Sequence, residues 1–247
     1  MDLFDYMREN NMTKEEPLAS RMRPKTLDEV MGQKHIIGKD KLLYRAIKAD
    51  KLSSIIFYGP PGTGKTTLAK VIANTTSASF RQINATVAGK KDMEDVVNGA
   101  KDIMASMGQR TILFVDEIHR LNRAVEEILY PAMEDYAIDI IIGKGPSANS
   151  IRLDLPKFTL IGATTRAGSL SAPLRDRFGV TLRLELYTPE ELAKIVTRSA
   201  GILNVSIEPE GAMEIARRSR GTPRIANRML RRVRDFAQVM ADGVITK

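Results

Sequence analysis

Apolar and polar residues alternate in blocks along the central part of the chain. Four short apolar runs have the length of buried strands, at 55–58, 80–84, 111–115 and 158–162. Segments with helical spacing separate these runs, at 65–75, 91–106 and 123–134. Strands that alternate with helices form parallel sheets covered on both faces, so the pattern predicts an α/β domain over residues 19–186.

The two ends of the chain differ from this central part. After Tyr187 only helical patterns follow, at 189–203, 208–219 and 223–241, and proline stands at helix starts. We therefore expect residues 187–247 to form a small all-α lid domain. Residues 1–18 are polar, charged and without apolar periodicity, which is typical of a mobile arm.

Polar residues ahead of the first strand carry signals for helix starts. Thr26 and Glu29 have the spacing of a capping box, and Asp40 precedes an amphipathic pattern at 42–47. We expect a short helix after Thr26 and a longer one after Asp40.

Two β-like runs interrupt the alternation of strands and helices between 138 and 155. The first run is rich in isoleucine, and the two runs are joined by the sequence GKGPSANS. The pattern predicts a protruding hairpin over 138–155. Its apolar side chains need cover, which either the neighbouring parts of the sheet or a partner protein can provide.

Charge and cysteine content narrow the setting of the protein. The formal net charge of +8 favours a polyanionic partner, and the most basic part is 211–247, where Arg228, Arg231 and Arg232 can face DNA, a neighbouring subunit or solvent. With no cysteine, disulfides and thiolate metal sites are excluded, so a cytoplasmic location is the default. No apolar run approaches the ~18 residues of a membrane span, and we expect no membrane contact.

The sequence GPPGTGKTT at 59–67 matches the phosphate-binding pattern G-x-x-x-x-G-K-[ST] in full and follows the first strand. Its glycines allow backbone N–H groups to point at a di- or triphosphate, and the helix that begins there adds its positive end. Lys65 can reach the β and γ oxygens, and the Thr66 hydroxyl can ligate Mg²⁺. The predicted contacts to ATP are Gly59, Gly62, Gly64, Lys65, Thr66 and Thr67.

The apolar run at 111–115 ends in two adjacent carboxylates, Asp116 and Glu117. The carboxyl ends of the strands are where open α/β sheets bind their ligands. Asp116 is expected to hold Mg²⁺ together with Thr66, and Glu117 to orient and polarise the attacking water. The tetrapeptide at 116–119 also matches the DExH box of superfamily 2 helicases, but no Q-x-x-G-R-x-G-R stretch follows it.

Three further polar residues complete the predicted catalytic set. Thr165 follows the apolar run at 158–162 and can contact the γ-phosphate or the water. Arg177 is our candidate for an arginine supplied to a neighbouring subunit, whereas we expect Arg175 to pair with Asp176. Arg224 falls in the first turn of a helix, where a cation is unfavourable unless an anionic ligand is bound.

With these residues in view, the chain resembles the AAA+ ATPases, and from about residue 116 onward it resembles the RuvB family of Holliday junction branch-migration motors. The matching stretches include DEIHRLNRAVEEILYPAMED, GATTRAGSLSAPLRDRFG and RGTPRIANRMLRRVRDFAQ. The resemblance implies that Thr165 is sensor 1, Arg177 the trans-acting finger and Arg224 sensor 2. It also implies that the hairpin 138–155 docks on a RuvA-like partner, and that the nucleotide site is further lined by Glu134, Asp135, Tyr136 and Tyr187.

Residues 1–115 resemble RarA (MgsA), a related AAA+ recombination ATPase, which suggests a hybrid chain joined near the apolar strand at 111–115. In both families the segment with Met22 and Arg23 lies beside the adenine. A RuvB chain normally continues into a winged-helix domain that grips DNA, and nothing follows Lys247 here. The resemblance therefore implies that branched DNA is bound only weakly.

The motifs predict a P-loop ATPase that uses ATP and Mg²⁺. The resemblance implies a homo-oligomeric AAA+ ring, expected to be a hexamer, that acts on Holliday junctions in recombination and repair. A RarA-like ATPase acting in replication-associated recombination is the alternative enzyme. A non-catalytic AAA+ module that only assembles is the alternative from another class.

Overall fold

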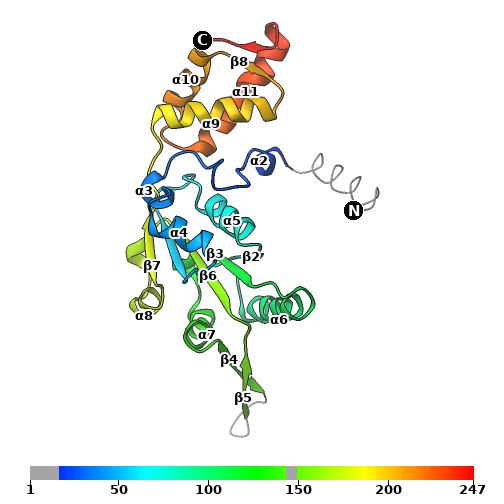
Figure 1. The fold of residues 1–247 in the computed structure, drawn as a ribbon, viewed down its shortest axis with the longest axis vertical. Helices are drawn as coiled ribbons and strands as arrows, with labels where there is room; N and C mark the ends of the chain where they lie inside the picture. Colours follow the sequence, from blue (N-terminus) through cyan, green and yellow to red (C-terminus); the bar gives the residue numbers. More distant parts are fainter. Residues whose placement is uncertain (1–16, 143–148) are drawn as a thin grey trace. The chain divides into compact units, whose positions relative to one another are not determined.

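The computed structural model describes residues 17–142 and 149–247, so the predicted arm at 1–18 lies almost wholly outside the described residues. The chain forms two compact units (Figure 1). The sheet unit spans Gln33–Glu185, and the helical unit combines Leu186–Lys247 with the residues up to Gly32. Contacts thus group the segment before Gln33 with the C-terminal helices, whereas the sequence pattern assigns residues 19–186 to one domain.

The sheet unit contains most of the elements. In chain order they are α3 Lys34–Ile37, α4 Leu42–Lys48, β1 Ile55–Tyr58, α5 Lys65–Thr75, β2 Ser79–Asn84, α6 Lys90–Met107, β3 Thr111–Asp116, the 3-10 turn η1 Ile118–Arg120, α7 Arg123–Glu134, β4 Ala137–Ile142, β5 Asn149–Asp154, β6 Phe158–Thr164, η3 Ala167–Ser169, α8 Ala172–Asp176 and β7 Val180–Arg183. Among its described residues, 17–32 and 186–247, the helical unit holds α2 Leu18–Arg21, α9 Pro189–Ile202, β8 Ser206–Ile207, α10 Pro209–Arg218, α11 Pro223–Met240 and β9 Val244–Ile245.

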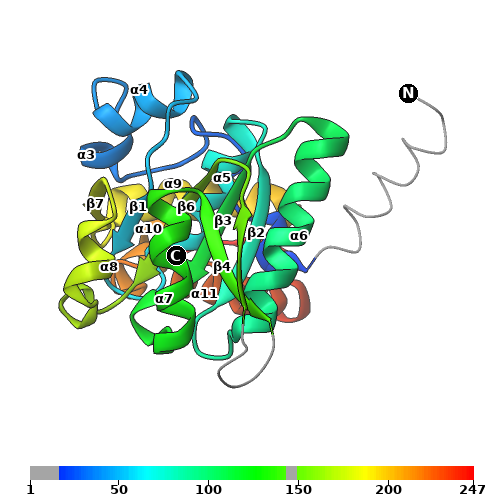
Figure 2. The ribbon, with the colours of Figure 1, turned by 90° about the horizontal axis from the view of Figure 1, so that it is seen from below.

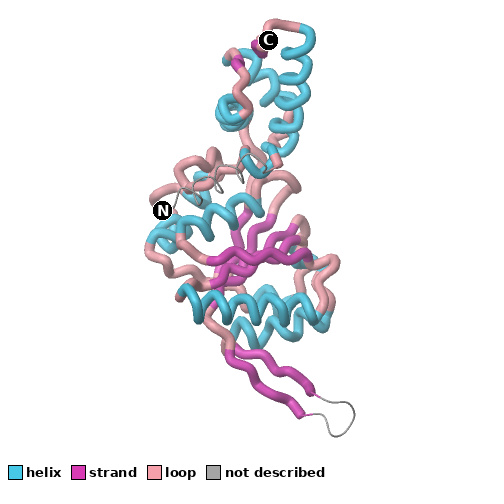
Figure 3. Tube along the Cα trace, turned by 90° about the vertical axis from the view of Figure 1, so that its right-hand side faces the viewer, coloured by secondary structure: helices cyan, strands magenta, loops and turns pink. Residues whose placement is uncertain are grey.

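A five-stranded parallel sheet of order β2-β3-β6-β1-β7 forms the centre of the sheet unit. Helix α5 covers one face, and α6 and α7 lie together on the other (Figures 1, 2 and 3). The central strands are buried along most of their length because both faces are covered. The predicted α/β fold is confirmed.

The fifth strand, β7, was not predicted. It is four residues long and alternates between partly buried and exposed side chains at the edge of the sheet, so it lacks the continuous apolar run of the central strands. Parallel pairing with β1, for example of Ile55 with Val180, holds β7 in the sheet.

The two predicted caps before the first strand are wrong. No helix forms after Thr26, because Glu29 instead accepts the N–H of Lys25 and forms an ion pair with Arg198 of α9. Helix α4 begins at Leu42 after an uncapped Lys41, and the Asp40 carboxylate pairs with the Lys41 ammonium instead. Both carboxylates thus pair with a cationic side chain, Arg198 or Lys41, instead of capping the backbone N–H groups of a helix.

The helical unit has a core of its own. Leu192, Val196, Leu230 and Ile245 are buried there together. The expectation of an all-α unit needs one correction, because β8 and β9 pair in parallel. Each is only two residues long, too short to show a period of two in the sequence.

The predicted hairpin forms as the antiparallel pair β4 and β5 at the lower end of the sheet unit (Figure 1). At its base Ile138 is buried and packs with Val97 of α6 and Ala132 of α7, so the sheet unit itself covers this side chain. The hairpin tip at 143–148 lies outside the described residues. Across the described ranges, no helix has the length and apolar character needed to span a bilayer.

Candidate functional site

The predicted phosphate loop connects β1 to α5 at the carboxyl edge of the sheet. Gly59, Gly62 and Gly64 all have positive φ, at 143°, 80° and 99°. Gly64 is the N-cap of α5, and it carries no side chain that could satisfy the first N–H groups of the helix. Free N–H groups at the positive end of an 11-residue helix suit an anionic ligand.

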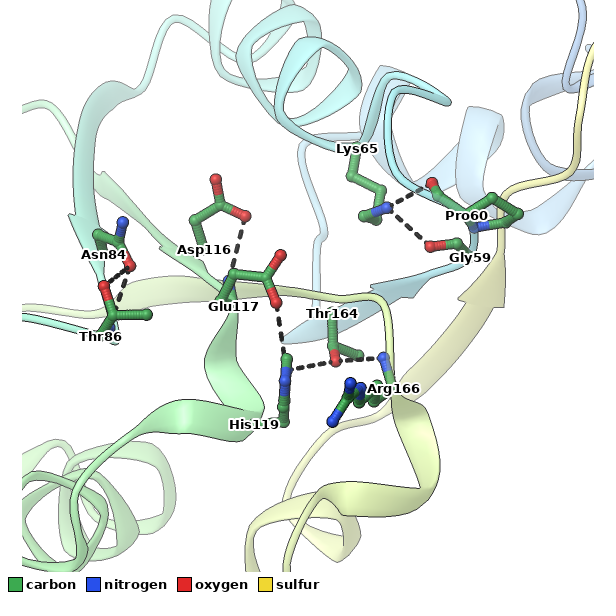
Figure 4. A network of polar contacts seen from close by, with 10 residues as sticks. All are labelled: Gly59, Pro60, Lys65, Asn84, Thr86, Asp116, Glu117, His119, Thr164 and Arg166. Carbon is green, nitrogen blue, oxygen red and sulfur yellow. Dashed lines mark hydrogen bonds and ion pairs between the residues drawn. The ribbon is translucent and has the colours of Figure 1, made fainter. Parts of the chain in front are cut away.

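Lys65 is buried in this loop. Its Nζ donates to the carbonyl oxygens of Gly59 at 2.9 Å and Pro60 at 2.8 Å (Figure 4). Burial lowers the pKa of the ammonium group, while the carboxylates of Glu117 and Asp116 act in the opposite direction. The structure thus brings the loop lysine and the carboxylate pair into one electrostatic site.

Gly59→Ala should disable the loop. A Cβ at this position would lie 2.2 Å from the carbonyl oxygen of Leu184, and the φ of 143° is one that L side chains rarely adopt. We expect a loss of about 1–3 kcal/mol in the free energy of unfolding, together with lost nucleotide binding. Calorimetric unfolding and a nucleotide titration measure the two effects.

Gly201→Ala is the matched control for this substitution. Gly201 lies in α9 with nothing within 4 Å of the added Cβ, and alanine there should stabilise the helix by about 0.5–1 kcal/mol without changing nucleotide binding. If Gly59→Ala has the same free energy of unfolding and the same nucleotide affinity as the unaltered protein, the assigned loop geometry is incorrect.

The carboxylate pair follows β3, two strands away from β1 in the sheet. Burial raises the pKa of the Asp116 carboxyl group, the nearby Glu117 carboxylate raises it further, and the N–H of Glu117 and the charge of Lys65 oppose the rise. The Glu117 N–H donates to Asp116 Oδ1 at 3.1 Å. A bound cation would remove the cost of ionising Asp116 in this partly buried position.

Glu117 has a left-handed backbone, with φ 51° and ψ 42°, which is uncommon for a residue other than glycine. Its Oε2 lies 3.5 Å from Nδ1 of the largely buried His119. The hydroxyl of Thr164, at the end of β6, lies 2.8 Å from the same nitrogen and accepts the N–H of Arg166 (Figure 4). His119 therefore connects the carboxylate after β3 to the end of β6.

Burial also lowers the pKa of His119, and the positive charges of Arg120 and Arg166 add to this effect against the Glu117 carboxylate. A neutral imidazole that carries its proton on Nδ1 donates from this nitrogen toward the Thr164 hydroxyl oxygen and the Glu117 carboxylate, so this tautomer links the two groups. The expected sensor, Thr165, is exposed just beyond the strand, whereas Thr164 is buried.

His119 and Thr164 were missed as site residues by the sequence interpretation. The pattern Asp-Glu-Ile-His and the paired threonines after the apolar run were the available signals. Asn84 was missed as well: it ends β2 in register with Asp116, and its Oδ1 accepts the N–H and hydroxyl of Thr86 (Figure 4).

The residues at the carboxyl edge fit a Mg²⁺–nucleotide. Within the described ranges no cluster of three or more metal-binding side chains occurs. A site for Mg²⁺ does not need one, because this ion usually keeps several waters and takes one or two carboxylates plus phosphate oxygens. Asp116 can supply the carboxylate and Thr66 the hydroxyl, with the loop N–H groups facing the phosphates.

The other predicted site residues of the sheet unit lie at its opposite edge. The Gly179 N–H donates to the carbonyl of Ser54, directly before β1, so Arg177 stands near the amino ends of the strands. Its guanidinium forms an ion pair with Glu134 at 2.9 Å. Arg175 pairs with Asp176 at 3.7 Å, as predicted.

Asp135 and Tyr136 follow Glu134 at the base of the hairpin. The Asp135 carboxylate accepts a hydrogen bond of 2.9 Å from Arg152 of β5, and Tyr136 meets Phe158 edge to face. The Tyr136 carbonyl accepts the N–H of Leu155, just ahead of β6. These residues are therefore not beside the phosphate loop of their own chain.

The remaining predicted contacts belong to the helical unit. Met22 is buried and its carbonyl accepts a hydrogen bond of 3.0 Å from Arg198, while Arg23 is partly buried. Tyr187 is buried and its N–H donates to the Gly221 carbonyl. Arg224 is exposed in the first turn of α11 after the N-cap Thr222, as predicted, although the Thr222 hydroxyl bonds to Ser219 rather than capping the helix.

A parallel sheet that carries a phosphate loop after β1 and a carboxylate pair at the end of β3, in a chain with a separate unit of helices, defines a P-loop ATPase of the AAA+ class. Family models support this class. The model of the Holliday junction DNA helicase RuvB P-loop domain matches residues 22–184, and the model of the RuvB AAA lid domain matches residues 187–247. The chain belongs to the RuvB family.

Solved structures agree. A Thermotoga maritima RuvB point mutant is 44% identical with a TM-score of 0.77, covering 89% of this chain and 69% of that one. The Thermotoga maritima RuvB Holliday junction branch migration motor is 43% identical with a TM-score of 0.75, covering 90% of this chain and 68% of that one. The matched P-loop model runs across residue 115, where the hybrid hypothesis placed a join, and the RarA resemblance of residues 1–115 stays a prediction.

Proposed function

We propose that this protein hydrolyses ATP, with Mg²⁺, as the motor subunit of a ring that moves Holliday junctions in recombination and repair. One observation carries the proposal. The phosphate loop and carboxylates lie at one edge of the sheet, and Arg177 with Glu134 lies at the other. The strand between the two edges, β1, has four residues and is about 13 Å long.

This separation favours sites that are shared between subunits. An arginine at the amino edge faces away from the phosphates of its own chain, so it can complete a site only on a neighbouring copy. An arginine supplied in this way is worth about 10³–10⁵ in rate. The RuvB resemblance makes a hexameric ring the expected assembly.

The phosphates would lie against the N–H groups at the start of α5. Lys65 would exchange the carbonyls of Gly59 and Pro60 for the β and γ phosphate oxygens. Burial disfavours the charged form of this ammonium group, and the anionic phosphates would stabilise it. Mg²⁺ held by Thr66 and Asp116 would neutralise charge that develops on the phosphates.

Glu117 would hold the attacking water. His119 and Thr164 restrict where its carboxylate can lie, because they tie it to the end of β6. Thr165, which follows directly and is exposed, is the residue placed to meet the γ-phosphate or the water. From the helical unit, Met22, Arg23, Tyr187 and Arg224 would contact the adenine and the phosphates, as the family resemblance implies.

The hairpin β4–β5 is the proposed contact to a RuvA-like partner. It extends from the amino edge of the sheet, away from the phosphate loop, so a partner can bind it without blocking nucleotide entry (Figure 1). Branched DNA is the proposed polyanionic partner of this chain with its net charge of +8.

A steady-state ATPase assay tests the proposed function. We expect measurable hydrolysis by the protein alone, and a further rise when a four-way junction and RuvA are added together. A linear duplex of the same total length, with RuvA, is the control and should stimulate less. Direct binding of the junction should weaken steeply with salt, because phosphate neutralisation dominates it.

Two outcomes would contradict the proposal. Nucleotide binding without any turnover, with or without junction and RuvA, would indicate a non-catalytic assembly module. Equal stimulation by linear and four-way DNA would indicate a DNA-dependent ATPase with no role at junctions.

A further inference from the structure

One face of α7 contacts both ends of α8. Glu126, Tyr130 and Glu134 follow one another at intervals of four residues and therefore share this face. The hydroxyl of Ser171, the N-cap of α8, donates to the Glu126 carboxylate, and the Tyr130 hydroxyl donates to the same oxygen at 2.7 Å. At the other end of α8, its C-cap residue Arg177 lies against Tyr130 and Glu134.

The Arg177 guanidinium is held on three sides. Its central carbon lies 4.4 Å from the centroid of the Tyr130 ring. One terminal nitrogen donates to the Pro173 carbonyl at 2.7 Å, and the other lies 2.9 Å from Glu134. The side chain is only 24% exposed, so the cation over the ring is partly desolvated, which strengthens the attraction.

We propose that Tyr130 is a positioning residue for Arg177, and that Glu134 stores the guanidinium until a phosphate of the neighbouring subunit replaces its carboxylate. The inference rests on the trans role proposed above for Arg177. The attraction between the charged guanidinium and the ring 4.4 Å away does not depend on which acceptors its N–H groups bind, so it can persist when a phosphate accepts them. The Glu134 contact uses one of those donors and must be given up.

Solvent exposure also separates the two partners of Arg177, since Glu134 is exposed and Tyr130 is partly buried. The Glu134 side chain is 54% exposed, and an exposed ion pair of this kind is weak and easily exchanged for a phosphate. The Tyr130 ring is partly buried and is fixed through its hydroxyl to Glu126. The tyrosine therefore stays in place while the glutamate is displaced.

Replacing Tyr130 tests the positioning role. Tyr130→Leu should lower the kcat for ATP by about 10- to 100-fold with little change in KM, because the finger is misplaced while the nucleotide site is intact. Tyr130→Phe keeps the ring and should lower kcat by no more than about threefold. Equal losses in the two variants would overturn the role of the ring.

Glu134→Gln tests the storage role. Removing the competing charge should raise the ATPase rate at low chain concentration by about two- to fivefold, because the guanidinium is then free to meet a phosphate. A loss as large as that of Arg177→Ala would show instead that Glu134 itself serves the reaction, and would overturn storage.

Mixing separates positioning from folding. Tyr130→Leu chains mixed with Glu117→Gln chains should regain activity, because the Glu117→Gln chains supply intact fingers to intact water-positioning sites. A misfolded Tyr130→Leu chain would not, and failure to regain activity counts against the inference. Tyr44→Leu is the matched control, because it also removes a tyrosine ring from beside a cation. Lys48 Nζ lies 5.8 Å from the centroid of the Tyr44 ring on α4, outside the site.

The two proposals fail in different ways. If Arg177→Ala retains full activity, the trans role of the arginine is wrong. If Arg177→Ala loses activity and Tyr130→Leu keeps it, the trans role stands and only the positioning role of Tyr130 is wrong.

Discussion

Lys65→Ala is expected to weaken Mg²⁺–nucleotide binding by about a hundredfold or more, because hydrogen bonds to charged groups each contribute about 1.5–3 kcal/mol. The substitution also removes the donor that satisfies the carbonyls of Gly59 and Pro60 within the loop. Calorimetric titration with ATP and with ADP measures the loss. The control Lys91→Ala removes an exposed cation from the first turn of α6 and should bind as the unaltered protein does.

Glu117→Gln should keep nucleotide binding, which Lys65→Ala loses, and should lose hydrolysis. ATP should bind almost normally, since the phosphate loop is unchanged, while single-turnover hydrolysis should fall by about 10²–10⁴ because an amide cannot act as a base toward water. Equal ATP affinity in Lys65→Ala and the unaltered protein would refute the phosphate site. Full turnover in Glu117→Gln would refute the role of this carboxylate.

Arg177→Ala should bind ATP almost normally and lose turnover by about 10³–10⁵. The physical reason is the position of Arg177 at the amino edge of the sheet, from which it can serve only the phosphates of another copy. Arg175→Ala is the matched control from the same short helix. Arg175 pairs only with the adjacent Asp176 among the described residues, so its loss should change turnover little.

A mixture of Arg177→Ala with Glu117→Gln checks whether sites are shared. Each variant alone is expected to hydrolyse ATP very slowly, but interfaces that pair an intact finger with an intact carboxylate should recover part of the activity. The rate per chain should also fall on dilution, as the ring dissociates. A dilute monomer that hydrolyses ATP as fast as the concentrated protein would rule out a finger supplied in trans.

Local sequence alone determined the nucleotide-binding half of the site. The phosphate loop depends on the short-range order of strand, glycines, lysine and helix, and Gly59, Gly62 and Gly64 take the positive φ angles that such a turn requires. The boundaries of β1 and the start of α5 followed from the same pattern. Asp116 and Glu117 were predictable because an apolar run that ends in carboxylates is itself a local signal.

Only the tertiary structure decided which side chains meet across elements. His119 bridges Glu117 and Thr164 because β3 and β6 are neighbours in the sheet, which no spacing in the sequence states. Packing also overrode local signals: Glu29 pairs with Arg198 of α9 instead of capping a helix.

The separation of the site into two edges was likewise decided by the fold. Arg177 was predicted as a candidate from its residue type and sequence context. Its place near the amino ends of the strands, over Tyr130 and beside Glu134, depends on how α7 and α8 pack together. The sequence by itself determined the phosphate loop, because the loop is built from consecutive residues. The direction of the strands decided that Arg177 lies at the end of the sheet opposite the phosphate loop, because the two ends of a parallel sheet face opposite ways.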